Sequence, residues 1–340
     1  MTERASPAAP VAPRGWLVAP GFDLLFVANV LWPLALIPWL GGDPGAPLSF
    51  WQLYFLTTPH RWATLLLVAA DPDRREGRGR LFVGIALAFA VLVAGVYWWT
   101  GAFLCLALID FVWNGWHFAA QHAGILRMYA RKVGGGVVGL ERHGLRLFIF
   151  YTTLRLAGWT TGWLDADPQS QALLRAVDAL VLGLAVALLA VQARGWTWSH
   201  AGKLAYLLSV CALYAALLVS VREGYTPLTI SLTLAAAIFH ATEYLAVVTH
   251  YAWRRCDHGG AAPFRWAARN WLAVLFGFML ALGAFESSLG RDPGPLWVGL
   301  NLWAAFLHYT YDGLIWKLRR PATAAALGVG GTPIAGGVPS

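Results

Sequence analysis

Long apolar runs separated by short polar segments dominate the chain, and they predict a bundle of transmembrane helices. A helix that crosses a membrane needs about 20 mainly apolar residues. Ten such runs lie at residues 22–40, 50–70, 81–99, 101–123, 145–164, 172–193, 202–221, 227–252, 269–288 and 296–317. The breaks between them carry turn-forming residues, such as GGDP at 41–44 and DPGP at 292–295. We therefore predict an all-α fold of about ten spans in a single domain over 22–317.

The tails on either side of this domain are rich in Ala, Pro and Gly and lack an apolar run. Segments of that composition do not bury enough apolar surface to order themselves. The sequence therefore predicts disordered cytoplasmic tails at 1–21 and 318–340.

Composition and charge narrow the class of protein further. Hydrophobic residues make up 58% of the chain and charged residues 12%, against about 25% charged in an average soluble domain, which excludes an ordinary soluble enzyme. The net charge of +8 does not indicate nucleic-acid binding, because the basic residues lie in short stretches between apolar runs. With ten spans, 20 Lys and Arg residues fall on one side and 3 on the other, so the positive-inside rule predicts cytoplasmic ends in a bacterial inner membrane.

Six of the nine histidines lie within predicted spans, all of them even-numbered: His60, His117, His122, His240, His250 and His308. Even-numbered spans run in the same direction, so the depth of their residues can be compared. Four of the six then fall in the middle or inner half of the bilayer and can share one layer: His60, His117, His240 and His308.

Helical spacing adds polar partners to these histidines. Residues three, four or seven apart share a helix face, which gives three seams: Asp110, Asn114, His117 and Gln121; His240, Glu243 and His250; and Asn301, His308 and Asp312. A charged residue at a helix centre costs about 2.5–3.5 kcal/mol on insertion scales, and a bound cation would offset that cost. Imidazole and carboxylate ligands suit iron, zinc or copper.

The predicted metal ligands are His60, His117, His122, His240, His308, Glu243 and Asp312, with Glu243 and Asp312 as the catalytic carboxylates. Asp110, Asn114, Gln121 and His250 would orient these ligands. Other interpretations stay open: membrane histidines also join helices by hydrogen bonds, His122 and His250 lie near the cytoplasmic ends, and Asp110 could pair with Arg61 or Arg155. A parallel duplication would relate the second and fourth spans to the eighth and tenth.

Three stretches carry a resemblance: TTPH at 57–60, WNGWHFAAQHAG at 113–124 and HYTYDGLIWKLR at 308–319. Together they resemble a group of multi-histidine bacterial integral membrane proteins, a resemblance that locates a site without naming a reaction. The stretch from Trp116 to His122 is also remotely similar to one helix of the Brp/Blh-type carotene dioxygenases, which are iron proteins. The HxxxH and HxxHH boxes of membrane desaturases are absent from the sequence.

The function expected from these features is a metal-dependent oxidoreductase of the iron oxygenase, hydroxylase or desaturase type. It would hold one or two iron ions and act on a membrane lipid or another lipophilic substrate. A separate electron donor would be needed, because no nucleotide fingerprint is present. One alternative is a haem protein that transfers electrons to or from quinone, and another is a proton- or metal-coupled transporter. The sequence leaves the oligomeric state open.

Overall fold

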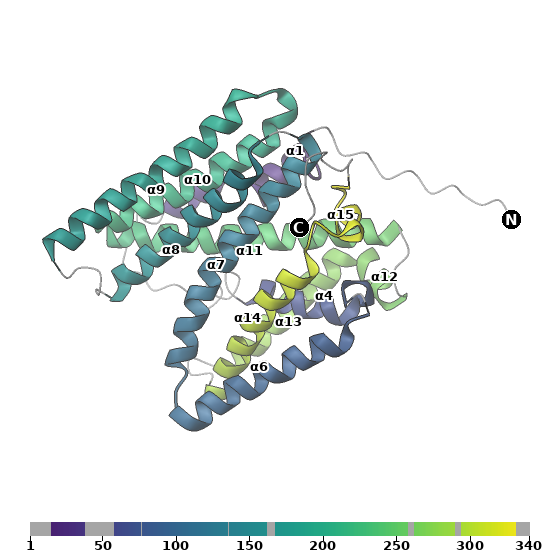
Figure 1. Ribbon diagram of the computed structural model, residues 1–340. Coiled ribbons are helices and arrows are strands. Elements are labelled where there is room, and N and C mark those ends of the chain that lie inside the picture. The colour runs from purple at the N-terminus through teal and green to yellow at the C-terminus, as the bar shows by residue number, and fades with distance from the viewer. Residues whose placement is uncertain are drawn as a thin grey trace.

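The computed structural model describes residues 15–37, 58–75, 77–134, 136–161, 167–257, 262–289 and 294–330. Within these ranges all regular secondary structure is helical and no strand is present, which confirms the all-α class (Figure 1). The long helices are α6 (Gly79–Thr100), α7 (Leu104–Val133), α8 (Leu145–Thr161), α9 (Pro168–Arg194), α10 (Ala201–Arg222), α11 (Thr226–Asp257), α13 (Trp271–Ser288) and α14 (Gly294–Ile315). Shorter elements are α1 (Pro20–Phe22), η1 (Asp23–Val27), η2 (Trp32–Leu36), α4 (Pro59–Ala70), α5 (Pro72–Arg75), η3 (Leu140–Gly144), η4 (Trp198–His200), α12 (Ala262–Arg269) and α15 (Pro321–Ala326).

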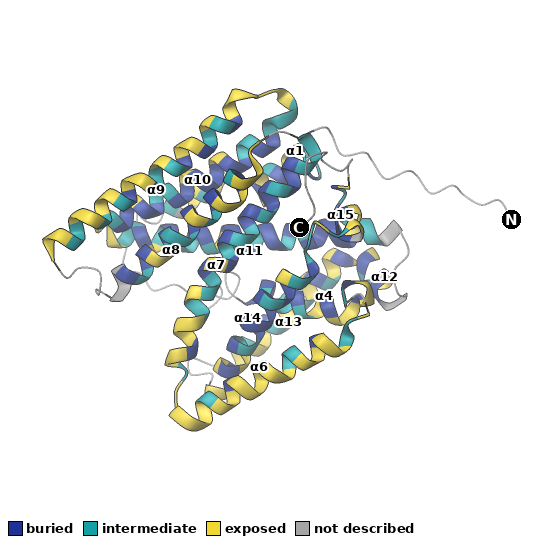
Figure 2. Cartoon of the chain, in the orientation of Figure 1, coloured by how far each residue is buried: buried dark blue, intermediate teal, exposed yellow. Residues whose placement is uncertain are grey.

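Five of the described helices are long and apolar enough to cross a membrane: α6, α9, α10 with the preceding η4, α11 and α13. Few residues of α6, α9 and α13 are buried, whereas half or more of α10 and α11 lies inside the bundle. Figure 2 shows the exposed residues along α6 and α9, and Leu87 and Val91 of α6 are 62% and 72% exposed. An exposed apolar surface of that extent needs a lipid environment, so the chain has the character of a membrane protein. The predicted count of ten spans is not confirmed, because α7 and α14 carry polar residues that lower their hydropathy and α4 and α8 are short.

The predicted first span at 22–40 is not a continuous helix in its described part. It consists of α1, η1 and η2, and it is broken at Asn29, where φ is +43°. The Asn29 amide donates to the carbonyl of Phe26 at 3.1 Å and to that of Phe239 on α11 at 3.4 Å. The helix therefore breaks because Asn, which tolerates a positive φ, gains partners on a neighbouring helix. Residues 38–57, which include the start of the predicted second span, lie outside the described residues.

The segment after α14 differs from the predicted disorder over residues 318–330. Residues 321–326 form α15, which packs against α11, and Ala324, Leu327 and Val329 are buried. The carbonyl of Leu327 accepts a hydrogen bond from Nε2 of His250 at 3.2 Å. The apolar residues of this segment are thus buried against α11, a contact that cannot be predicted from the composition of the segment. Residue 17 of the predicted N-terminal tail is buried in the same way, whereas residues 1–14 and 331–340 lie outside the described part.

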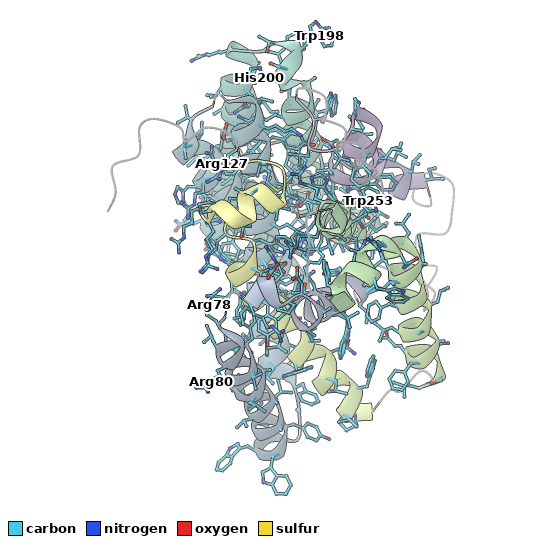
Figure 3. All side chains as sticks on the ribbon, turned by 90° about the vertical axis from the view of Figure 1, so that its right-hand side faces the viewer. Arg78, Arg80, Arg127, Trp198, His200 and Trp253 are labelled. Carbon is cyan, nitrogen blue, oxygen red and sulfur yellow. The ribbon has the colours of Figure 1, made fainter. Side chains whose placement is uncertain are left out.

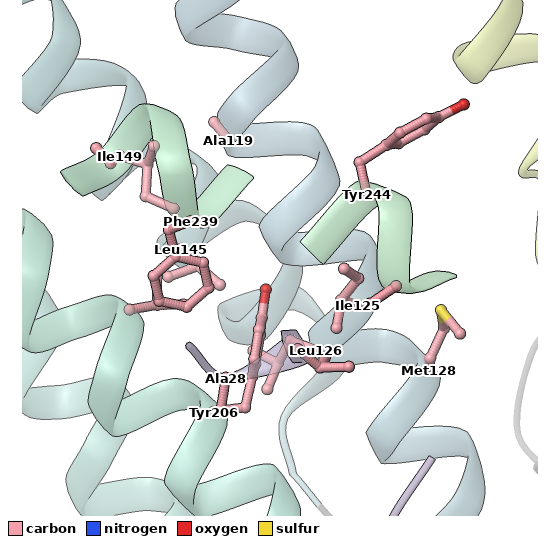
Figure 4. Packing of buried hydrophobic residues seen from close by; sticks show 14 of the residues in the cluster. Ala28, Ala119, Ile125, Leu126, Met128, Leu145, Ile149, Tyr206, Phe239 and Tyr244 are labelled. Carbon is pink, nitrogen blue, oxygen red and sulfur yellow. The ribbon is translucent and has the colours of Figure 1, made fainter. Parts of the chain in front are cut away.

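Two helices, α7 and α11, join the parts of the bundle. On one side α7 packs against α8 and α11 packs against α10, while on the other side α14 contacts α4, α6 and α7 (Figure 1). Figure 4 shows the core between α7, α10 and α11, where Leu126, Tyr206 and Phe239 interdigitate. The polar helix faces predicted from the sequence therefore point into the interior, where neighbouring helices can supply partners.

A capped loop outside the bundle illustrates how the helix ends are fixed. Asp167 precedes α9 and accepts hydrogen bonds from the backbone amides of Gln169 and Ser170 and from the Ser170 hydroxyl. The hydrogen bonds from Ser170 and Gln169 hold the pKa of the Asp167 carboxyl below its usual value. Asp167 is therefore an N-cap that orients the start of α9.

Candidate metal centre

Four histidines from four different helices meet in the interior of the bundle. His60 lies in the first turn of α4, His117 near the middle of α7, His240 in α11 and His308 in α14. All four side chains are buried, and those of His240 and His308 have no exposed surface. We refer to His60, His117, His240 and His308 as the four-histidine cluster.

The four rings surround a common point. The ring centre of His60 is 5.2 Å from that of His240 and 5.0 Å from that of His308. The ring centre of His117 is 5.0 Å from His240 and 4.6 Å from His308. His240 and His308 face each other across the cluster at 6.4 Å. Neighbouring rings meet edge to face, with interplanar angles of 67° to 87°.

Most ring nitrogens of the cluster have no hydrogen-bond partner among the described residues. They are Nδ1 of His60, Nε2 of His117, both nitrogens of His240 and Nε2 of His308. One nitrogen each of His60, His240 and His308 lie within 4.8 Å of one another, as do one nitrogen each of His117 and His308 and an oxygen of Asp312. An unsatisfied buried polar group costs about 1–3 kcal/mol, so a bound ligand at this point would remove a large penalty.

Asp312 stands beside the cluster, one turn after His308 on α14. Its Oδ2 is 3.8 Å from Nε2 of His117 and 3.7 Å from Nδ1 of His308. Its Oδ1 accepts hydrogen bonds from the hydroxyls of Tyr244 at 3.1 Å and Thr64 at 3.3 Å. The carboxylate is therefore held by one oxygen, while the other oxygen faces the imidazoles.

Thr64 and Phe118, which the sequence analysis did not assign to the site, each contact a histidine of the cluster. The Thr64 hydroxyl lies 2.6 Å from Nδ1 of His308 and 2.5 Å from the Tyr244 hydroxyl. The ring of Phe118 stacks on that of His240 at 3.9 Å between ring centres. Thr64 follows His60 by four residues, so its place on the same helix face could have been noticed in the sequence. The stacking of Phe118 could not, because it depends on how α7 and α11 pack.

Glu243 and His122, both predicted ligands, form a separate buried group. Oε2 of Glu243 lies 3.1 Å from Nδ1 of His122 and accepts a hydrogen bond from the Tyr206 hydroxyl at 2.9 Å. The side-chain amide of Gln121 donates to Oε1 of Glu243 at 2.9 Å and to the backbone carbonyl of His240 at 3.0 Å. Nε2 of His122 lies 3.4 Å from the Tyr214 hydroxyl.

Helix geometry explains why Glu243 and His240 diverge. Each residue of an α-helix turns by about 100°, so a position three residues later lies roughly 60° short of a full turn. His240 lies against His60 of α4, His117 of α7 and His308 of α14. Glu243 contacts His122, farther along α7, and Tyr206 of α10. Tyr244, the next residue after Glu243, donates a hydrogen bond to Asp312 and so lies beside the four-histidine cluster. The three-residue spacing therefore does not place His240 and Glu243 in the same group of side chains.

The remaining predicted residues lie around the cluster or away from it. Asp110 accepts a hydrogen bond from Tyr309 at 2.9 Å and lies 4.0 Å from Arg61, whereas Arg155 pairs with Asp178. Asn114 faces a small cavity of about 110 Å³ on another side of α7. His250 is ten residues beyond His240, about 15 Å along α11, and bonds to Leu327 instead.

A cavity of about 700 Å³ adjoins the cluster between α7, α11 and α14. His117, Tyr244 and Asp312 form part of its wall. Trp113, Trp116 and Tyr309, aromatic residues of the predicted spans, also line it. The candidate centre is therefore accessible from a space large enough for an organic molecule.

Comparison with known proteins adds no assignment: no protein-family model matches the chain, and no curated protein or solved structure is significantly similar to it.

Proposed function

We propose that this protein is a membrane-embedded, metal-dependent oxidoreductase that acts on a lipophilic substrate, with a metal ion held by the four-histidine cluster. The observation that carries the proposal is the set of five partnerless ring nitrogens on four buried imidazoles that surround one point. Histidines that only join helices would use those nitrogens in hydrogen bonds. Several buried ring nitrogens without hydrogen-bond partners are typical of histidines that bind a cation.

The spacing of the rings fits direct binding of an ion. The ring centres of His240 and His308 are 6.4 Å apart. Half of this distance is close to the sum of a metal–nitrogen bond of about 2.1 Å and the distance from the nitrogen to the centre of an imidazole ring. Adjacent imidazoles bound at about 2.1 Å have ring centres roughly 4.5–5.5 Å apart, and the four observed separations are 4.6 to 5.2 Å. Asp312 would be a further oxygen ligand or would orient an imidazole.

This arrangement favours a bare ion over haem. His240 and His308 could face each other across an iron atom, but the rings of His60 and His117 stand about 5 Å from both. They occupy the space that a porphyrin ring between His240 and His308 would need. The haem alternative would therefore require the four helices to move apart.

Iron suits a site of several imidazoles and one carboxylate, and the remote resemblance around His117 points to the same metal. Hydroxylation consumes one O₂, two electrons and two protons, and yields an alcohol and one water. Desaturation consumes the same reagents, removes two hydrogens from the substrate and yields two waters. In both reactions the electrons come from a separate electron-transfer protein or quinol. The metal, when bound, would supply the oxygen chemistry, and the residues of this chain would bind it and exclude water.

The experiment that tests this proposal compares lipids from cells that express the parent chain with lipids from cells that express a His240→Ala, His308→Ala double variant, all grown under ¹⁸O₂. We expect products that contain one ¹⁸O atom or lack two hydrogens only with the parent. A His250→Ala variant is the matched control, because His250 lies on α11 outside the cluster. Identical lipid profiles for the parent and the double variant, at equal expression, would contradict the proposal.

The buried group around Glu243 favours a second candidate, a proton-coupled transporter. Glu243, His122, Tyr206 and Tyr214 form a continuous chain of hydrogen-bonding groups in the interior. Such chains mark proton pathways in membrane proteins. Proton flux in proteoliposomes that Glu243→Gln abolishes, with no metal bound to the parent, would favour the transporter over the oxidoreductase.

A further inference from the structure

The cavity beside the four-histidine cluster has two chemically different ends. At one end lie His117, Tyr244 and Asp312. The rest of its wall includes six basic residues, which we call the basic rim: Arg127, Arg131, Arg142, Arg146, Lys317 and Arg319. Asp312 is the only acidic residue in the described lining, so every charged residue of the wall away from the cluster is basic.

The direction of the cavity follows from α7. His117, Ala120, Gly124, Arg127 and Arg131 line it in succession. Arg127 and Arg131 are ten and fourteen residues beyond His117, or about 15 and 21 Å along the helix axis. That distance is close to half of the roughly 30 Å hydrocarbon core of a bilayer. The cavity therefore extends from the cluster over about the depth of one leaflet.

The stretch between the two ends is apolar. The small residues Ala120 and Gly124 leave space along α7, and Val247 of α11 and Trp316 of α14 contribute apolar surface. A hydrocarbon chain gains little free energy by moving from the bilayer to such apolar walls, so binding requires partners for its polar end as well. The rim supplies those partners.

The rim is short of anions. Glu141 binds Arg127 at 3.0 Å and also binds Lys203 at 2.5 Å, so this carboxylate is already shared. Arg131, Arg142 and Arg146 form no ion pair with any described carboxylate. Nε of Arg146 is buried without a hydrogen-bond partner, and its guanidinium stands over the ring of Trp116 at 5.5 Å. Three neighbouring arginines without counter-ions are the usual donors for a carboxylate or phosphate group.

We infer that the cavity binds an amphiphile with an anionic head, a carboxylate or a phosphate, whose hydrocarbon tail points toward the four-histidine cluster. This inference rests on the proposed function, since it treats the cluster as the reactive end of the cavity. It narrows the substrate class, because neutral and cationic lipids offer no counter-ion to Arg131, Arg142 and Arg146. It also assigns the reaction to the tail and not to the head of the substrate.

Binding can be measured on purified protein in neutral detergent with four probes that share a sixteen-carbon chain: palmitate, hexadecyl phosphate, hexadecanol and hexadecyltrimethylammonium. We expect the two anionic probes to bind at least tenfold more tightly than the other two. An Arg142→Gln, Arg146→Gln double variant should weaken anionic binding by roughly tenfold per arginine and leave hexadecanol unchanged. Equal affinity of all four probes would overturn the inference.

A matched control separates the cavity from the general basic surface. Arg80 lies on the same flank of the molecule as Arg127 (Figure 3), is exposed, and does not line the cavity. Arg80→Gln should leave the affinity for hexadecyl phosphate unchanged. Inorganic phosphate alone should bind much more weakly than hexadecyl phosphate. A loss with Arg80→Gln as large as with the double variant, or phosphate binding as tight as that of hexadecyl phosphate, would contradict the inference.

The orientation is tested with two palmitate analogues that carry a photoreactive diazirine, one near the carboxylate and one at the chain end. We expect the first to label residues 138–146 and the second to label residues 113–120 or 309–313. Labelling in the reverse order, or only on the lipid-facing helices α6 and α9, would overturn it. Neither the binding assay nor the labelling experiment needs a bound metal. Failure of the anionic probes to bind selectively would therefore leave the metal proposal unaffected. A metal-free protein that still binds palmitate would refute only the proposed function.

Discussion

Replacement of Thr64 by valine tests whether the groups around His308 prepare it as a metal ligand. Valine keeps the shape of threonine but removes the hydroxyl that lies 2.6 Å from Nδ1 of His308 and 3.3 Å from Oδ1 of Asp312. If His308 holds the metal through Nε2, its Nδ1–H would donate a hydrogen bond to the Thr64 hydroxyl, which in turn donates one to Asp312. The variant breaks this chain while all four histidines remain in place.

The size of the effect follows from these contacts. Loss of a group that orients a ligating histidine typically lowers metal affinity by about 10–100-fold, or about 1.4–2.8 kcal/mol at about 1.4 kcal/mol per tenfold change. The unsatisfied Nδ1 of His308 should also lower the stability of the fold by about 1–3 kcal/mol. The metal dissociation constant is measured by competition with a chromophoric chelator on metal-stripped protein, and stability by thermal unfolding in the same detergent.

Thr249→Val is the matched control for this substitution. Thr249 is buried on α11 and accepts a hydrogen bond from Nε1 of Trp271 at 2.9 Å, away from the cluster. It should reproduce the loss of stability and leave the metal affinity unchanged. A Thr64→Val variant that binds metal like the parent, or a Thr249→Val variant that loses as much affinity, would refute the role given to Thr64.

Three further predictions follow from the contacts of single residues. Alanine at any one position of the four-histidine cluster should lower the metal affinity by more than roughly 100-fold, the upper value for an orienting group. His250→Ala should leave the metal affinity unchanged in the same competition assay. Glu243→Gln should keep the full metal content in elemental analysis, because Glu243 binds His122 and Tyr206 and not the cluster; loss of metal would return Glu243 to the ligand set. Lys203→Met should lower the unfolding free energy by about 3–5 kcal/mol, since it leaves the buried Glu141 carboxylate with less charge compensation, whereas Arg222→Met, which breaks a partly exposed pair with Glu223, should change it by less than about 1 kcal/mol.

The meeting of the four histidines follows from information that the sequence contains. The apolar runs predict where the helices lie, and the predicted order of ten spans places the four histidines on spans of the same direction; the number of spans and their directions stay predictions. Residues at similar depths on such helices can meet, as His60 and His308 do. The all-helical class and the membrane character depend on the lengths of the apolar runs and on composition, and both can be obtained from the sequence without knowledge of tertiary contacts.

Side-chain direction could not be predicted at the same level. A spacing of three residues placed Glu243 with His240, but the 60° between them sends these side chains to different neighbours. The break at Asn29 depends on a contact with Phe239, 210 residues away. The role of Arg142 and Arg146 also depends on tertiary packing, because in the sequence they are only two of the many arginines on the predicted cytoplasmic side.

The proposed duplication and the cytoplasmic position of both ends stay predictions. The two related histidine pairs do meet in one place, but His60 lies at the start of α4 whereas His240 lies within α11. A parallel repeat would put both at corresponding positions of helices of similar length. Only 12 residues of α4 are described as helical, against 32 in α11.

The central claim is that the four imidazoles bind one metal centre, and elemental analysis of purified protein tests it most directly. Protein purified without chelators from cells grown with iron should contain at least one transition-metal ion, most of it iron, per chain. The His240→Ala, His308→Ala double variant, purified in parallel, should contain almost none. A folded parent protein without bound transition metal, even after incubation with ferrous iron, would contradict the account.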